Sequence, residues 1–155
     1  MKAAIILAAI GLVLAQVGQV RATELEHVAV TQGGLFLAAE RGDPRAQTQI
    51  GFMYETGHGL PQDYMLAVAW YQRAAEQGYP RAQHLLGMMY ERGQGVAEDY
   101  VTAHKWLNLA TAAARGRGER DFYRRTRDSV GWKMTLAQVT EAQWRARHFQ
   151  PRSER

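Results

Sequence analysis

The chain has 155 residues, of which 46% are hydrophobic and 22% charged, and its formal net charge at pH 7 is +4. This balance is typical of a globular protein and excludes a disordered chain, which carries too few apolar residues to build a core. The sequence has no cysteine, which excludes disulfides, cysteine nucleophiles, thiolate metal sites and dithiol redox chemistry.

The beginning of the chain, residues 1–22, has the layout of a secretory signal peptide. Lys2 is followed by an apolar run over residues 3–15 and then by a more polar stretch that ends at Ala22. The run is short for a helix that spans a bilayer. We expect cleavage after Ala22, with cleavage after Ala15 and an uncleaved anchor as the alternatives. The mature protein is then expected in the periplasm or outside the cell, without stable membrane insertion.

The chain after this leader repeats itself at an offset of 36 residues. The stretch YETGHGLPQDY at residues 54–64 returns as YERGQGVAEDY at residues 90–100. The same offset aligns Trp70 with Trp106. A weaker half-copy, LAAERGDPRA, precedes the two full copies. A period of this length is typical of a helical repeat array, in which stacked units bury a shared core.

Each copy predicts two helices joined by a glycine-rich turn. The first helix begins near Pro44, because proline is tolerated in a first turn, where its missing N–H would have no partner. Gly57 lies where a left-handed residue ends a helix. Asp63 lies where a side chain accepts hydrogen bonds from the free N–H groups of the next helix. The same residue types recur one period later, at Pro80, Gly93 and Asp99.

The ordered alanines, glycines, Tyr, Asp and Trp of these copies resemble the Sel-1-like repeat, a relative of the tetratricopeptide repeat. The resemblance implies an all-α fold, a right-handed α-solenoid of antiparallel helix pairs. It also implies a role as a protein–protein scaffold with no fixed active site or cofactor. The expected parts are a half-repeat at about 28–43, full repeats at about 44–79 and 80–115, capping helices at about 119–149 and a tail at 150–155.

The segment after the repeats resembles the capping helices that end exported bacterial members of this family. Thr135 followed by Gln138 predicts a capping box, in which each residue bonds the backbone of the other. Val139, Ala142 and Ala146 then lie along one face of the last helix. Such a face is suited to cover the open apolar end of a solenoid.

Catalytic and metal-binding interpretations of the repeated glycine phrase find little support. The phrase lacks the third glycine and the Gly-Lys-Ser/Thr sequence that phosphate-binding loops need. His58, near Asp63, becomes Gln94 in the second copy. No two of the five histidines lie four residues apart, so we expect surface histidines without a metal. We therefore expect no enzyme activity, no cofactor and no metal.

Two surfaces remain as candidates for binding a partner. The first is a face of the first helices of both repeats, with side chains at Thr48, Phe52, Glu55, His84, Met88 and Glu91. The second is a basic stripe at Arg120, Arg124 and Arg127. The alternatives are that the apolar members pack against neighbouring helices, and that the arginines form a solvated face paired as Asp121–Arg125 and Arg124–Asp128.

Charge is divided unevenly between the two parts of the chain. Residues 23–114 carry six Lys or Arg against ten Asp or Glu, a net −4, and residues 115–155 carry eleven against five, a net +6. Export separates the protein from nucleic acid, so the expected partner is a protein or peptide of the cell envelope. A monomer is favoured, and the oligomeric state is open.

Two other functions stay open beside the exported scaffold. An envelope signalling regulator would bind the exported part of a membrane sensor. A cell-wall or β-lactam hydrolase is the other alternative, because some exported relatives with cysteine-rich repeats are associated with that chemistry. The absence of cysteine argues against it.

Overall fold

The computed structural model describes residues 33–154, so the expected leader lies outside the described residues. The chain divides into two compact units, Met1–Leu35 and Phe36–Arg155. Of the first unit only residues 33–35 are described, and they are helical. Within residues 33–154 no helix is long and apolar enough to cross a membrane.

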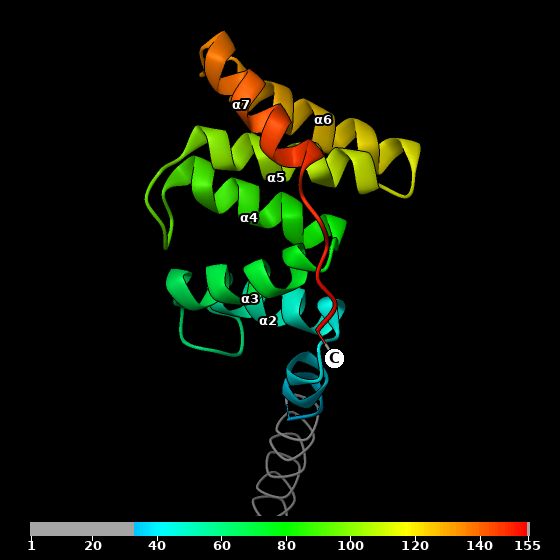
Figure 1. Cartoon of the computed structure of the whole chain (residues 1–155). Helices are drawn as coiled ribbons and strands as arrows, with labels where there is room; N and C mark the ends of the chain where they lie inside the picture. Colours follow the sequence, from blue (N-terminus) through cyan, green and yellow to red (C-terminus); the bar gives the residue numbers. More distant parts are fainter. Residues whose placement is uncertain (1–32, 155) are drawn as a thin grey trace, which may run out of the picture. The chain divides into compact units, whose positions relative to one another are not determined.

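The second unit is all-helical in its described part, which confirms the expected fold class. Helical residues 36–40 come first. Six further helices follow (Figure 1): α2 (Pro44–Thr56), α3 (Tyr64–Glu76), α4 (Pro80–Arg92), α5 (Tyr100–Ala113), α6 (Arg117–Gly131) and α7 (Leu136–Arg147). Successive helices from α2 to α6 pack on one another, and α7 packs on α5.

The first helices of the two repeats begin and end, and the second helices begin, at the residues that the sequence predicts. Asp63 and Asp99 each accept a hydrogen bond from a backbone N–H in the first turn of α3 and α5, at 2.9 and 3.0 Å. Gly57 and Gly93 end α2 and α4 with φ of 75° and 64°. Only glycine adopts this left-handed geometry without strain. The repeated phrase is therefore the joint between the two helices of a repeat.

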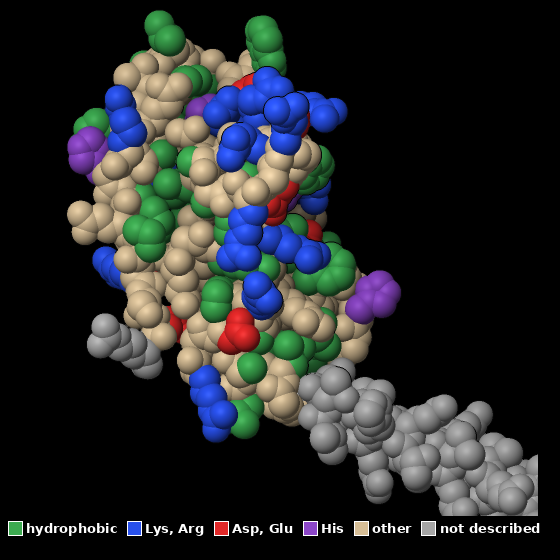
Figure 2. Space-filling model, turned by 90° about the vertical axis from the view of Figure 1, so that its right-hand side faces the viewer, with side chains coloured by type: hydrophobic (Ala, Val, Ile, Leu, Met, Phe, Trp, Pro, Cys, Tyr) green, Lys and Arg blue, Asp and Glu red, His purple; other side chains and the backbone are tan. Residues whose placement is uncertain are grey.

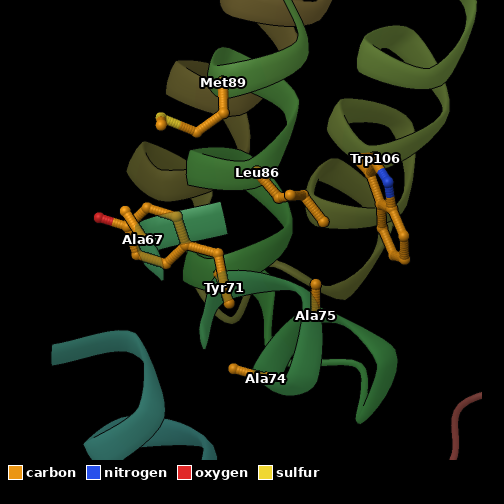
Figure 3. Packing of buried hydrophobic residues seen from close by; sticks show 8 residues of the cluster. Ala67, Tyr71, Ala74, Ala75, Leu86, Met89 and Trp106 are labelled. Carbon is orange, nitrogen blue, oxygen red and sulfur yellow. The ribbon is translucent and has the colours of Figure 1, made fainter. Parts of the chain in front are cut away.

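The core lies where successive helix pairs meet. Tyr71 from α3, Leu86 from α4 and Trp106 from α5 are buried together, and Figure 3 shows their side chains in the space between these helices. Small residues let the helix backbones approach closely. A Cβ at Gly87 would lie 2.8 Å from Cγ of Leu107, inside the contact distance. Burial of each large side chain contributes about 1.5–3 kcal/mol to folding.

The last two helices cover the end of the second repeat. The predicted capping box is present: Gln138 N–H donates to Thr135 Oγ1, and Thr135 N–H donates to Gln138 Oε1. Ala142 and Ala146 are buried, as expected for the face that packs on a neighbouring helix. Val139 is half-buried.

Residues 149–154, here called the strap, follow α7 without regular secondary structure. In Figure 1 the strap runs back from α7 past α5 and α4 toward α3 and α2. It therefore lies beside helices that precede it by many residues in the sequence.

Candidate partner-binding surface

The starts of α2 and α4 enclose a hollow of about 350 Å³ on the surface of the repeats. We call its lining the binding face: Arg45, Thr48, Gln49, Phe52, Tyr79 and Arg81. The two arginines occupy equivalent positions one period apart, each directly after the proline that begins a first helix. The 36-residue repeat therefore places two guanidinium groups at one hollow.

The binding face combines an exposed aromatic ring with free positive charge. Phe52 is 42% exposed. Within residues 33–154, neither Arg45 nor Arg81 forms an ion pair, although arginines elsewhere in the fold do. The helix α4, which begins beside Arg81, has no side-chain cap, so its free N–H groups add positive potential there, whereas the Asp43 carboxylate caps the start of α2 beside Arg45. The arrangement suits a partner that offers an apolar group and a carboxylate.

Many Lys and Arg side chains lie on the face of the molecule that Figure 2 shows. Figure 2 shows them in a cluster that continues as a band, with hydrophobic side chains between. Residues 115–155 contribute most of the positive charge, a net +6. A surface of one charge sign raises the local concentration of an oppositely charged partner.

The first-helix candidates differ in how accessible they are. Thr48 is buried, and its hydroxyl donates to the Pro44 carbonyl at 2.6 Å. Glu55 is half-buried and accepts a hydrogen bond from the Tyr71 hydroxyl at 2.6 Å. Burial and this carboxylate raise the pKa of Tyr71. Phe52 remains the large exposed side chain of this set on α2.

The equivalent candidates on α4 also take part in the fold. Met88 is half-buried, and Glu91 pairs with Lys133 at 2.5 Å. His84 is buried, with its ring stacked on that of Tyr123 at 4.7 Å between centroids. Whether a partner binds at these positions stays a prediction, but contact with His84 would require α6 to move.

The expectation of surface histidines is wrong for His84 and His104, which are both buried. Burial disfavours the charged ring and Arg92 repels it, so the pKa of His84 is lowered to about 4. Burial also lowers the pKa of His104. The helical pattern did not reveal this, because the helix α6 that covers His84 follows the repeats. No cluster of three or more potential metal-ligating His, Asp or Glu side chains occurs in the described part.

The basic stripe lies on α6 as expected. Arg120 and Arg124 are exposed and Arg127 is half-buried. Arg127 reaches back to the repeats, where its Nη1 donates to the Asn108 side-chain oxygen at 3.3 Å. Arg120 and Arg124 are therefore accessible to a partner, whereas Arg127 joins α6 to α5.

The ion pairs on α6 differ from the two that the sequence predicted. Arg124 pairs with Asp121 at 3.4 Å, and Arg127 pairs with Asp128 at 2.7 Å. Arg125 instead donates its Nε–H to the backbone carbonyl of Asp121 at 3.3 Å. The Asp121 carboxylate already pairs with Arg124. Arg125, its predicted partner, therefore bonds the Asp121 backbone carbonyl instead.

Sequence reasoning missed Arg45 and Arg81 as candidates for partner binding. The signal was present, because the dipeptide Pro-Arg begins both first helices one period apart. Phe122, which is 55% exposed, was also missed. Its ring lies 5.0 Å from that of the buried His84, a relation that depends on where α6 packs and is not visible in the repeat pattern.

Comparison with known families agrees with this architecture. The family model of the Sel1 repeat matches residues 44–79 and 80–114. These are the segments that contain α2 with α3 and α4 with α5. No curated protein is significantly similar to the chain.

Several solved structures, including the following two, are similar to this chain. One is c5321, a protective antigen of uropathogenic Escherichia coli strains with an SLR fold, which is 30% identical over 76% of this chain with a TM-score of 0.70. The chain spans only 24% of the length of that protein. The other is a Sel1 repeat protein from Oxalobacter formigenes, which is 44% identical to this chain with a TM-score of 0.53. The match includes 59% of this chain and 68% of that chain.

Proposed function

Because the chain belongs to the Sel1 repeat family, we propose that it is an exported scaffold that binds another protein through the binding face. Proteins of this family are generally non-catalytic interaction scaffolds. The observation that carries the proposal is the hollow that holds exposed Phe52 together with two guanidinium groups, Arg45 and Arg81, that form no ion pair among the described residues.

The chemistry of the binding face favours a partner segment with an apolar residue beside one or two carboxylates. Aromatic and arginine side chains supply much of the energy of protein interfaces. A guanidinium holds a carboxylate through two parallel hydrogen bonds, which adds geometric specificity. Phe52 offers an apolar anchor in the same hollow.

The basic stripe on α6 serves a different purpose in this proposal. Its charges are partly exposed and two of them already pair with Asp121 and Asp128. Exposed charges mainly speed the encounter of two proteins and add little to the lifetime of the complex. We therefore assign affinity to the binding face and steering to the stripe.

Export is the second part of the proposal and rests on the leader-like sequence of residues 1–22. An exported domain of this size without cysteine must be held together by packing alone. The partner is then a protein or peptide of the cell envelope rather than nucleic acid.

Site-specific photocrosslinking in living cells tests the proposal. A photoreactive phenylalanine analogue at Phe52 is expected to crosslink a single partner protein, and adding Arg45→Glu with Arg81→Glu should abolish the crosslink. Leu136 on α7 is the matched control position, because it is apolar and 84% exposed. Crosslinking of that partner from Leu136 but not from Phe52 would place the interface on another surface and contradict the proposal.

A further inference from the structure

The strap makes specific contacts at both of its ends. At one end the Phe149 ring meets the Trp106 ring edge-on, with 5.4 Å between centroids, and the Lys105 ammonium lies 5.3 Å from the centre of the Phe149 ring. At the other end the Glu154 carboxylate accepts hydrogen bonds from Gln47 Nε2 at 2.7 Å and from the guanidinium of Arg73 at 3.0 and 3.2 Å. An aromatic group and a carboxylate therefore anchor the segment.

The middle of the strap contacts the repeats through its backbone. The Arg152 N–H donates to the Glu76 carbonyl at the end of α3, at 2.8 Å. Residues 150–153 are otherwise exposed. The contacts are those of an extended peptide on a receptor, with two anchored ends and one backbone hydrogen bond between them.

The receptor surface follows the period of the repeats. Gly42 and Gly78 are equivalent residues one period apart, in the turns before α2 and α4. A Cβ at Gly42 would lie 2.8 Å from the Glu154 carbonyl oxygen, and one at Gly78 would lie 3.5 Å from Pro151. Pro151 and Glu154 are three residues apart, so the strap meets the turns before α4 and α2 at positions three residues apart.

The strap is held by contacts that an outside peptide can compete for. Arg73 and Glu154 are about one-third exposed, at 32% and 33%, and ion pairs at this exposure stabilise little because water screens them. A cleft of about 650 Å³ lies beside the strap, with walls that include Glu76, Lys105 and Trp106, and strap residues form another wall. This volume is in the range of sites that hold small ligands or side chains.

We propose that the groove beneath residues 149–154 is a second peptide-binding site, which the chain occupies with its own strap and which accepts an extended segment of a partner protein. The segment should carry an aromatic residue and, five positions later, a carboxylate, as Phe149 and Glu154 do. This site is distinct from the binding face, since the two share no lining residue. The tethered strap competes at an effective concentration in the millimolar range, so a partner binds more tightly once the strap is released.

The first test measures displacement in the otherwise native chain. Because the chain has no cysteine, Ser153→Cys provides a single attachment point for a nitroxide label on the exposed part of the strap. The label should broaden the NMR signals of the Gly42 and Gly78 amides. A synthetic peptide with the sequence FQPRSE, in excess, should restore these signals, whereas the control peptide AQPRSQ should not. Broadening that persists at saturating FQPRSE would overturn the proposal.

The second test measures affinity by fluorescence anisotropy with labelled FQPRSE. A strap-released chain, Phe149→Ala with Glu154→Gln, should bind the peptide at least about 10-fold more tightly than the native chain, because the open fraction sets the apparent affinity. Adding Arg73→Ala to that chain should remove the gain. Equal affinity for native and released chains contradicts the proposal. Crosslinking from Phe52 is unaffected in either case, so the two proposals fail separately.

Discussion

Gln47 and Gln83 occupy the same place in successive repeats, and each donates its side-chain amide to a backbone carbonyl of the preceding helical segment. Gln47 Nε2 lies 3.0 Å from the Ala39 carbonyl and Gln83 Nε2 lies 3.2 Å from the Ala75 carbonyl. Both glutamines are buried. The same hydrogen bond therefore joins each first helix to the helical segment before it. For α2 that segment is the helical stretch that precedes the first full repeat.

Removing this tie should destabilise the stack. Gln83→Ala deletes a buried hydrogen bond and leaves a small void, so the free energy of unfolding should fall by about 2 kcal/mol. Urea unfolding followed by circular dichroism measures it. Gln143→Ala, at an exposed position of α7, is the matched control and should stay within about 0.5 kcal/mol of the native chain. A similar small effect at Gln83 would show that the tie is dispensable.

The left-handed glycines of the repeated phrase should resist a β-branched residue. Gly57→Val and Gly93→Val should each lower the free energy of unfolding by about 1–2 kcal/mol, because their φ angles of 75° and 64° are strained for valine. Asparagine tolerates this region, so Gly57→Asn and Gly93→Asn should retain most of the stability. Full thermal stability of the valine variants with loss of partner binding would make the phrase a functional loop instead.

Stability should fall as the pH drops from 7 to 5, because of the buried His84. The unfolded chain takes up a proton near the ordinary pKa of 6.5, whereas the folded chain does so only near the lowered pKa of about 4. In this interval the unfolded chain binds a proton that the folded chain does not. The free energy of unfolding therefore falls by about 2 kcal/mol between pH 7 and pH 5. His104, whose pKa is also lowered, acts in the same direction.

His84→Phe should flatten this pH dependence, since phenylalanine fills the site beside Tyr123 without titrating. His58→Phe, in an exposed loop, is the control and should keep the native slope. Urea unfolding at pH 7, 6 and 5 gives all three slopes. A His84→Phe slope equal to that of the native chain would mean that other groups cause the loss.

The repeat pattern predicts the helices and turns well because each signal is local. Gly57 ends a helix and Asp63 starts the next through contacts within a few residues, and both recur one period later. The offset of 36 residues then predicts that successive helix pairs stack on one another. The capping box at Thr135 is equally local, so it too could be predicted and is confirmed.

Other features depend on contacts between residues far apart in the chain. His84 is buried because Tyr123 of α6 covers it, and no periodicity relates these two residues. The strap reaches Gln47 across 107 positions, and its sequence shows nothing of this. The binding face depends on both kinds of information. The repeated Pro-Arg dipeptide could be read from the sequence, but the position of its arginines beside Phe52 depends on how α2 packs on α4.

Export predicts a particular mature chain. We expect N-terminal sequencing of protein from the envelope fraction to begin at Thr23, because the polar part of the leader ends at Ala22. A start at Gln16 would indicate cleavage after Ala15. Recovery of the chain from the cytosol with Met1 in place would contradict both the localisation and the proposed class of partner.

The binding face is tested most directly by titration calorimetry of the native chain and its variants with the partner that crosslinks from Phe52. Phe52→Ala with Arg81→Ala should weaken the affinity at least about 100-fold, because aromatic and arginine anchors dominate interface energetics, while thermal unfolding stays unchanged. Leu136→Ala with Trp144→Ala, two exposed apolar positions on α7, should bind like the native chain. Native affinity in the Phe52 and Arg81 variant, with loss of binding in the α7 variant, would contradict the account.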